Sequence, residues 1–248
     1  MNRHERRKRG KLEKKGTARL MTNLSFSSGS DLSQEDVVSI GGITMHGIGL
    51  GPKVRECLAE KTADILARHG PKAFETPKRA TAIHEAGHVV INSVLGLETT
   101  EVYIEQVDKV RWIGWTHAPG LELAASVQNP ASPGRILMQS RATLAGIMAE
   151  DLFASPDDRR KGSSLDEAIA SQLIACEAAD RTGNRDGDRG REKFWRNQVW
   201  AWCSNQLWHN REVHAEIAEG LIMQGRIEGE ELRELCGRCE LYEPAEGA

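Results

Sequence analysis

Apolar residues recur at helical spacing in the stretch from residue 76 to residue 96. Their separations of three and four residues place them on one side of a helix. Thr76 is a suitable N-cap, Pro77 a suitable first helical residue and Gly96 a suitable stop. The pattern predicts one helix packed against a core, and its apolar positions are Ala80, Ile83, Gly87, Val90, Ile91 and Val94.

The pattern changes beyond this helix. Residues 100–107 and 110–117 are rich in β-branched and aromatic residues and are separated by a polar Asp-Lys pair, which predicts two adjacent strands. Helical spacing then returns, and Ser164 and Glu167 form a capping box for one of the helices. We therefore predict a mainly α fold with a small β-sheet, with later helices over about 132–153, 163–180, 191–209, 211–224 and 229–236.

The N-terminal part has a different composition. The first 20 residues carry 9 Lys/Arg and 2 Asp/Glu, whereas the 248-residue chain has 33 and 36. We expect residues 1–38 to be a disordered basic and Ser-rich tail, because few large apolar groups offset the ordering entropy. Residues 39–75 then form a Gly-rich lead and a helix, and 76–248 form the main domain, with its C-terminal helices at 190–248.

Several broad classes of protein are disfavoured. No stretch approaches the roughly 18 apolar residues of a membrane-spanning helix, and no apolar region follows the basic start as in a secretory signal. The five cysteines form no closely spaced even framework, which favours a cytoplasmic location. Cys236 and Cys239 have the spacing of a zinc knuckle, but no second Cys/His pair lies at a suitable distance.

The segment AIHEAGHVV, residues 82–90, carries the clearest chemistry. His84 and His88 are four residues apart and project from one helix face, so both ring nitrogens can bind one zinc ion at about 2.0–2.1 Å. Glu85 follows the first histidine and is placed to accept a proton from water activated by the metal. This H-E-x-x-H pattern predicts a zinc-dependent peptidase with one Zn²⁺ per chain.

A zinc site of this kind needs a third protein ligand. The metzincin pattern would place Gly and His where this chain has Ile91 and Val94, so the ligand must come from farther along the sequence. Glu150 in MAEDLF and Asp166 in GSSLDEAI are both candidates. Local sequence does not choose between them, since an Asp in the first turn of a capped helix is also stabilised by the helix dipole.

Several sequence blocks in order resemble the zinc peptidase domain of FtsH-type ATP-dependent proteases. HEAGHVV resembles that family's metal helix, and VYIEQ and WIGWT resemble the strands that follow. LAGIMAEDLF is similar to its Gly-rich, Ala-Glu-containing helix, and GSSLDEAIAS to its Gly-Ala-x-x-Asp-x-x-x-Ala-Thr block. NREVHAEIAEGLIMQGRIEGEELREL is similar to its closing helices, so the resemblance covers about residues 76–236.

The resemblance implies specific roles. It makes Asp166 the third ligand and leaves Glu150 as a hydrogen-bond partner that orients a ligand. It implies cleavage of unfolded protein or peptide substrates, and a ring of identical subunits. No G-x-x-x-x-G-K-[ST] motif occurs, so the family's ATPase module is missing from this sequence. We expect the peptidase to act alone on unfolded or small substrates, or with a separate ATPase partner.

A different class of function remains open. The chain could keep the zinc fold as a non-catalytic scaffold and bind a partner protein or nucleic acid. The basic residues within 1–20 and a helix that carries Trp195, Trp200, Trp202 and Trp208 would then form the binding surfaces. Cleavage of an unfolded substrate separates the two interpretations, because only the peptidase would show it.

Overall fold

The fold is taken from a computed structural model that describes residues 37–40, 43–46, 67–68, 70, 75–119, 133–156 and 189–243. The chain divides into two compact units, Met1–Phe74 and Glu75–Ala248. In the first unit, strand β1 (Val37–Ile40) pairs antiparallel with β2 (Ile43–His46). A disordered tail up to residue 38 and a Gly-rich lead after it were predicted for this region, and the pairing of β1 with β2 was not predicted.

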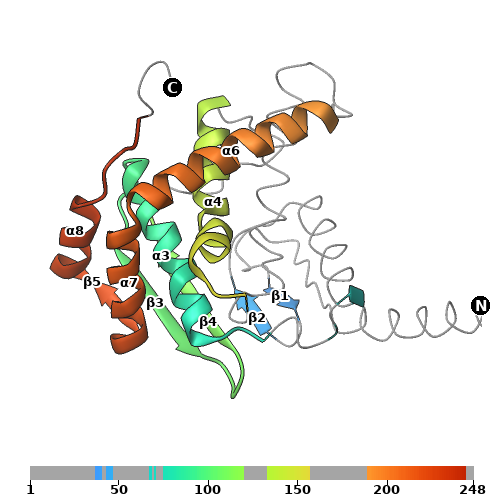
Figure 1. The fold of residues 1–248 in the computed structure, drawn as a ribbon. Coiled ribbons are helices and arrows are strands. Elements are labelled where there is room, and N and C mark those ends of the chain that lie inside the picture. Colours follow the sequence, from blue (N-terminus) through green and yellow to red (C-terminus); the bar gives the residue numbers. More distant parts are fainter. Residues whose placement is uncertain are drawn as a thin grey trace, which may run out of the picture. The chain divides into compact units, whose positions relative to one another are not determined.

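The second unit is mainly helical with a small sheet, as predicted (Figure 1). The two predicted strands and the helix predicted at 132–153 are present, and the last three predicted helices match α6, α7 and α8. The helix predicted at 163–180 lies outside the described residues. The elements in chain order are α3 (Lys78–Val94), β3 (Glu101–Gln106), β4 (Trp112–His117), α4 (Pro133–Phe153), α6 (Arg189–His209), α7 (Arg211–Gln224), β5 (Arg226–Glu228) and α8 (Gly229–Gly237).

The sheet has the order β4-β3-β5, and both pairings are antiparallel. Asp108 forms the turn between β3 and β4 by accepting hydrogen bonds from the backbone N–H groups of Val110 and Arg111, both at 3.0 Å. The three residues of β5 were not predicted as a strand. They are too few to show a period-two pattern in the sequence, and their pairing with β3 depends on the tertiary fold.

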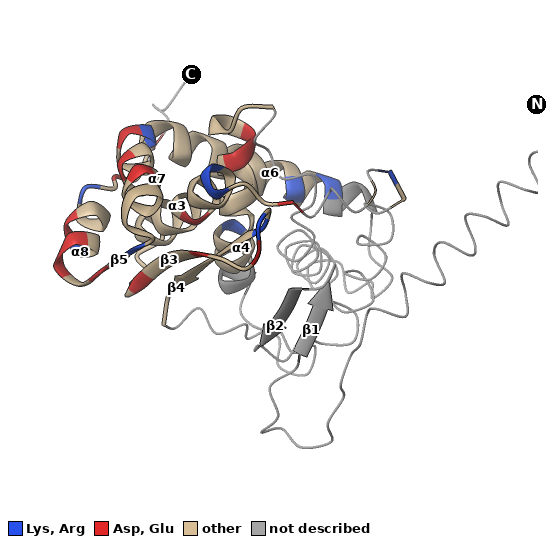
Figure 2. Ribbon diagram, turned by 90° about the horizontal axis from the view of Figure 1, so that it is seen from below, with Lys and Arg blue, Asp and Glu red and all other residues tan. Residues whose placement is uncertain are grey.

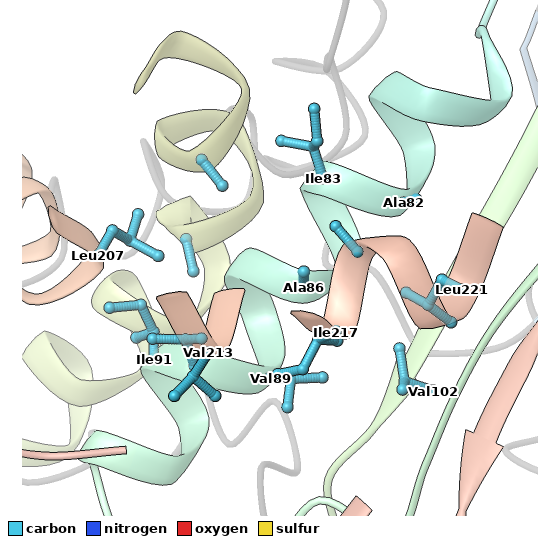
Figure 3. Packing of buried hydrophobic residues seen from close by; sticks show 14 of the residues in the cluster. Ala82, Ile83, Ala86, Val89, Ile91, Val102, Leu207, Val213, Ile217 and Leu221 are labelled. Carbon is cyan, nitrogen blue, oxygen red and sulfur yellow. The ribbon is translucent and has the colours of Figure 1, made fainter. Parts of the chain in front are cut away.

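Helix α3 is the centre of the unit. It lies between α7 and α4 with the sheet alongside (Figure 1). Figure 3 shows Ala86 and Val89 of α3 facing Ile217 of α7, within the buried apolar cluster. Gly87 allows α4 to approach closely, because a Cβ added there would lie 2.5 Å from the Cβ of Ala149. Burial on several sides makes α3 a rigid support for polar side chains.

The start of α3 differs from the prediction by one residue. Pro77, with an extended ψ of 145°, is the N-cap, and no side chain caps the helix. Thr76 instead bonds to β4: its hydroxyl donates to the carbonyl of Trp112 at 2.5 Å and its backbone carbonyl accepts from the N–H of Trp112 at 3.0 Å. The predicted stop is confirmed, since Gly96 follows the C-cap with a positive φ of 71°.

His214 of α7 is a buried histidine that links two helices. Its side chain is 2 % exposed, and its Nε2 lies 2.9 Å from the carbonyl oxygen of Ile83 in α3. A carbonyl can only accept, so Nε2 carries the proton and the ring is held in that tautomer. Burial lowers the pKa of His214 from its usual 6.5 to about 4, although the bond to Ile83 acts in the opposite direction.

This depressed pKa predicts a pH-dependent stability. Below pH 6.5 the unfolded chain binds a proton at residue 214 that the folded chain excludes until about pH 4. Stability is therefore complete above pH 6.5, and the contribution lost by pH 4 is on the order of 3 kcal/mol. Urea unfolding of the wild type and His214→Gln between pH 7 and pH 4 measures it. The histidines of α3 are common to both proteins, so equal pH slopes would contradict this assignment.

Charge is unevenly distributed over the described surface. Acidic residues gather on α7 and α8, whereas Lys and Arg gather near the start of α6 (Figure 2). Among the described residues, none of the helices combines the length and apolar character needed to cross a bilayer. The basic residues within 1–20 lie outside the described part of the chain.

Candidate metal centre

His84 and His88 converge on one point, as their i, i+4 spacing predicts. His84 is 3 % exposed, and its Nε2 lies 3.1 Å from the Nε2 of His88. The ring centroids are 4.8 Å apart and the ring planes meet at 73°. The two rings thus meet edge to face, with their Nε2 atoms facing each other.

The other ring nitrogen of each histidine, Nδ1, lies at hydrogen-bond distance from an acceptor. Nδ1 of His88 lies 2.8 Å from the carbonyl oxygen of Ala142 in α4, and Nδ1 of His84 lies 2.7 Å from Oε1 of Glu150, also in α4. A carbonyl and an ionised carboxylate can only accept hydrogen bonds, so both Nδ1 atoms carry the proton. In neutral rings, both Nε2 atoms then present a lone pair.

This donor arrangement fits a metal ion. Two lone pairs 3.1 Å apart cannot bond to each other, so the approach is favourable only with a proton or a cation between the nitrogens. Two histidine nitrogens on one tetrahedral zinc ion lie about 3.3 Å apart, since each bond is about 2.0–2.1 Å. The observed separation is close to that value. Orientation of metal-binding histidines by a carboxylate or a carbonyl is also usual in zinc sites.

A glycine on α4 makes room for this pair. A Cβ added at Gly146 would lie 2.4 Å from both Cε1 and Nε2 of the His84 ring. The His84 ring therefore lies directly against the α4 backbone at Gly146. Glu150, four residues later on α4, accepts a hydrogen bond from Nδ1 of the same ring. Helix α4 supplies the acceptors for both rings and the space for one of them.

Gly146→Ala should disturb the site through this contact. The added methyl group collides with a ring held on both sides, so we expect a loss of about 1–3 kcal/mol in stability and weaker metal binding. Gly220→Ala on α7 is the matched control. Its Cβ would meet the flexible end of Ile227 at 2.9 Å, and alanine is the better helix former. Chemical unfolding and zinc titration of both variants test this, and equal effects would contradict it.

Glu85 lies beside the pair, against the sheet. It is 5 % exposed, and its Oε2 accepts a hydrogen bond from the hydroxyl of Thr116 in β4 at 2.8 Å. A Cβ added at Gly114, two residues earlier on the same face of β4, would lie 2.3 Å from Cγ of Glu85. The strand thus accommodates the glutamate with a glycine and fixes one of its oxygens with a threonine.

Only part of the predicted ligand set can be placed. Asp166 lies outside the described residues. Within the described ranges, no group of three His, Cys, Asp or Glu side chains could hold a metal ion. Glu150 lies against Nδ1 of His84, on the side of the ring away from His88. That position suits a residue that orients a ligand.

Sequence reasoning missed four contributors to this site. Ala142 acts through its backbone, so its side chain gives no signal. Gly114 and Thr116 do carry a signal in the sequence, because a glycine inside a predicted strand often marks a close approach and residue 116 lies on the same face of the strand. Gly146 lies in the helical stretch ATLAGIMA, whose sequence does not show which neighbouring side chain needs the space.

The Cys236–Cys239 pair, which has the spacing of a zinc knuckle without a second pair to complete it, lies elsewhere. Both thiols are partly buried, Sγ of Cys239 donates to the carbonyl of Leu235 at 3.8 Å, and burial raises the pKa of both, that of Cys239 to about 11. Raised pKa values disfavour the thiolate that binds metals.

Strand β4 is an edge of the sheet beside Glu85. The N–H and C=O of Trp112 point away from β3 toward Thr76. Because every second residue of a strand directs its peptide groups to the same edge, those of Gly114 and Thr116 also point away from β3. Within the described part of the chain, no strand pairs with these later groups. The edge thus offers backbone donors and acceptors next to a buried carboxylate.

No protein-family model matches the sequence, and no curated protein matches it either.

Proposed function

We propose that this protein is a zinc-dependent metalloendopeptidase of FtsH-like type. The observation that carries the proposal is the approach of the His84 and His88 Nε2 atoms, with both Nδ1 atoms bound to acceptors. The order of the sequence blocks that resemble the FtsH-type peptidase domain supports the same conclusion and extends it to Asp166.

The proposed ligands are His84, His88 and Asp166, with Glu150 and the carbonyl of Ala142 holding the two rings in orientation. A bound zinc ion supplies Lewis acidity and makes water a stronger acid at neutral pH. Glu85 is the general base: its carboxylate accepts the proton of the attacking water and returns it to the leaving amine. Its buried position against β4 limits the orientations that the carboxylate can adopt.

The proposal is tested by metal content and activity together. Purified protein should take up one zinc per chain and cleave a fluorescently labelled unfolded protein, and a chelator should stop the cleavage. His88→Ala should bind zinc at least about 100-fold more weakly, since it lacks one protein ligand. A folded wild type that binds no zinc would contradict the proposal. A proton shared between the two Nε2 atoms would then explain their short separation.

The Thr116 hydroxyl should matter for turnover more than for substrate binding. Thr116→Val keeps the shape but removes the hydrogen bond to Oε2 of Glu85, so we expect kcat to fall about tenfold with KM little changed. Thr116→Ser, which retains the hydroxyl, is the control and should keep most of the activity. A selective rise in KM in the valine variant would indicate a substrate contact instead.

The edge of β4, with which no strand of the described residues pairs beyond Trp112, supports a mode of substrate binding. An extended peptide can add to this edge as a further strand and bond to the peptide groups of Gly114 and Thr116. Its scissile bond would then lie near Glu85. Peptide substrates N-methylated at alternate residues test this, because methylation in one register removes the donors that face β4. Equal cleavage of peptides methylated in either register would contradict strand addition.

One observation favours the scaffold alternative. Phe194 and Trp208 of α6 are 52 % and 58 % exposed, and exposed aromatic residues often mark protein interfaces. A scaffold that binds a partner protein or nucleic acid would retain the zinc site without cleaving any substrate. Zinc binding without cleavage, even with a separate ATPase supplied, would favour this second function.

A further inference from the structure

Two buried amide side chains lie where α6 ends and α7 begins. Gln206 is 1 % exposed and Asn210 is 4 % exposed, and the two are four residues apart, one helical turn. The segment that follows α8 runs up toward this end of α6 (Figure 1). Both amides use their side chains to bind the main chain of that segment.

Each amide binds one residue of the segment through two hydrogen bonds. Asn210 accepts from the N–H of Glu240 at 2.8 Å and donates to its carbonyl at 2.9 Å. Gln206 accepts from the N–H of Tyr242 and donates to its carbonyl, both at 2.8 Å. A neighbouring β-strand satisfies alternate residues of an extended chain in the same way. The two amides thus act in place of a strand.

Asn210 makes this contact in place of a helix cap. Asn is among the preferred N-cap residues, and Asn210 is the N-cap of α7, but its side chain makes no cap hydrogen bond. Its oxygen bonds instead to Glu240, 30 residues along the chain. Because both amides are buried, departure of the segment would leave their donors and acceptors to be satisfied by another occupant or by water.

The surroundings indicate which peptide fits. Nε2 of His209 lies 3.6 Å from the Glu240 carboxylate, and its ring centroid lies 5.5 Å from that of Tyr242. A cavity of about 380 Å³ lies beside them and is lined by residues that include Leu152, Trp208 and Arg211. An acidic residue followed two positions later by an aromatic one matches these contacts. Leu241, between them, is 52 % exposed, so its identity is unconstrained.

We propose that Gln206, Asn210 and His209 form a docking site for an extended peptide of the pattern acidic–any–aromatic, which the segment Glu240–Tyr242 occupies in the chain itself. The occupant is held mainly by main-chain hydrogen bonds and leaves its middle side chain exposed, so a peptide of the same pattern from a partner protein can replace it. The site recognises the backbone through the amides and the side chains through His209. The amide hydrogen bonds that hold the segment involve neither His84 nor His88, and the site does not depend on the proposed peptidase activity.

The test weakens the resident segment while the amides stay intact. Tyr242→Pro removes the N–H that Gln206 accepts, whereas Leu241→Pro removes an N–H for which the described part of the chain shows no hydrogen bond. The probe is a fluorescein-labelled, N-acetylated Glu-Leu-Tyr-Glu-Pro peptide, followed by anisotropy on the full chain. We expect at least tenfold tighter binding to Tyr242→Pro than to the wild type or Leu241→Pro, where the resident segment competes at about millimolar effective concentration.

Two controls test whether binding of the probe depends on Gln206. Gln206→Met in the Tyr242→Pro background should abolish binding. Should that variant fail to fold, the same probe with an N-methylated tyrosine must fail to bind Tyr242→Pro itself, because it cannot donate to Gln206. Equal binding to all the proteins, binding of the methylated probe, or no binding to a folded Tyr242→Pro would each overturn the docking site.

Discussion

Glu85→Gln is expected to lower kcat by about 10²–10⁴-fold while zinc affinity stays close to that of the wild type. The amide has nearly the shape of the carboxylate and can still accept the hydrogen bond of the Thr116 hydroxyl. It cannot take a proton from water, so the general base is removed while the histidine pair is left unchanged. The measurement combines cleavage of an unfolded substrate with a zinc titration on the same preparation.

Glu105→Gln provides the matched control. Glu105 is an exposed carboxylate on β3, close in sequence to β4 but without a part in the proposed site, and its substitution should change neither activity nor zinc affinity. A Glu85→Gln enzyme that retains full turnover would exclude Glu85 as the base. Parallel loss of zinc and activity would show that Glu85 holds the metal site together instead of moving a proton.

The central helix of this fold could be predicted in detail from sequence. The apolar spacing of 76–96 is long and regular, so helix α3 was placed to within two residues at each end. The i, i+4 spacing of His84 and His88 on that helix was sufficient to predict the convergence of their rings. Both are local properties of a helix, where residues four apart lie on one face whatever the tertiary fold.

The partners of this helix could not be predicted in the same way. Glu150 is 66 residues from His84, and Thr116 is 31 residues from Glu85. Their contacts depend on how α4 and β4 pack against α3, and that packing depends on glycines such as Gly87, Gly114 and Gly146 that permit a close approach. In a sequence, a glycine that permits close packing cannot be distinguished from one that ends a helix. Only its neighbours in the folded structure show its role.

The site also differs in kind from a buried histidine that serves structure alone. His214 is as buried as His84, but its Nε2 faces a carbonyl oxygen and the ring needs no further group on that nitrogen. At His84 and His88 the acceptors bond to the Nδ1 atoms, and the Nε2 atoms are directed at each other. The same residue type thus links helices in one place and brings two ring nitrogens together in another. The orientation of the Nε2 atoms, more than burial, supports the proposed metal centre.

Substitution of the two candidate carboxylates should affect zinc binding unequally. Asp166→Ala removes one of three proposed protein ligands, so we expect zinc affinity to fall by more than about 100-fold. Glu150→Gln still offers a carbonyl oxygen to Nδ1–H of His84 but loses the negative charge, for which the expected fall is about 10–100-fold. Competition with a chromophoric chelator measures both affinities, and Glu219→Gln, an exposed carboxylate on α7, is the control.

The order of these two effects decides the ligand set. A carboxylate that binds zinc directly loses a bond when it is replaced by alanine, whereas one that orients a ring only loosens it. A third variant, Glu150→Ala, completes the comparison: zinc lost in Glu150→Ala but retained in Asp166→Ala would reverse the assignment, with Glu150 as ligand and Asp166 as a residue of the helix start. In that case the hydrogen bond at Nδ1 of His84 would have to break when zinc binds, since one carboxylate oxygen would turn toward the metal.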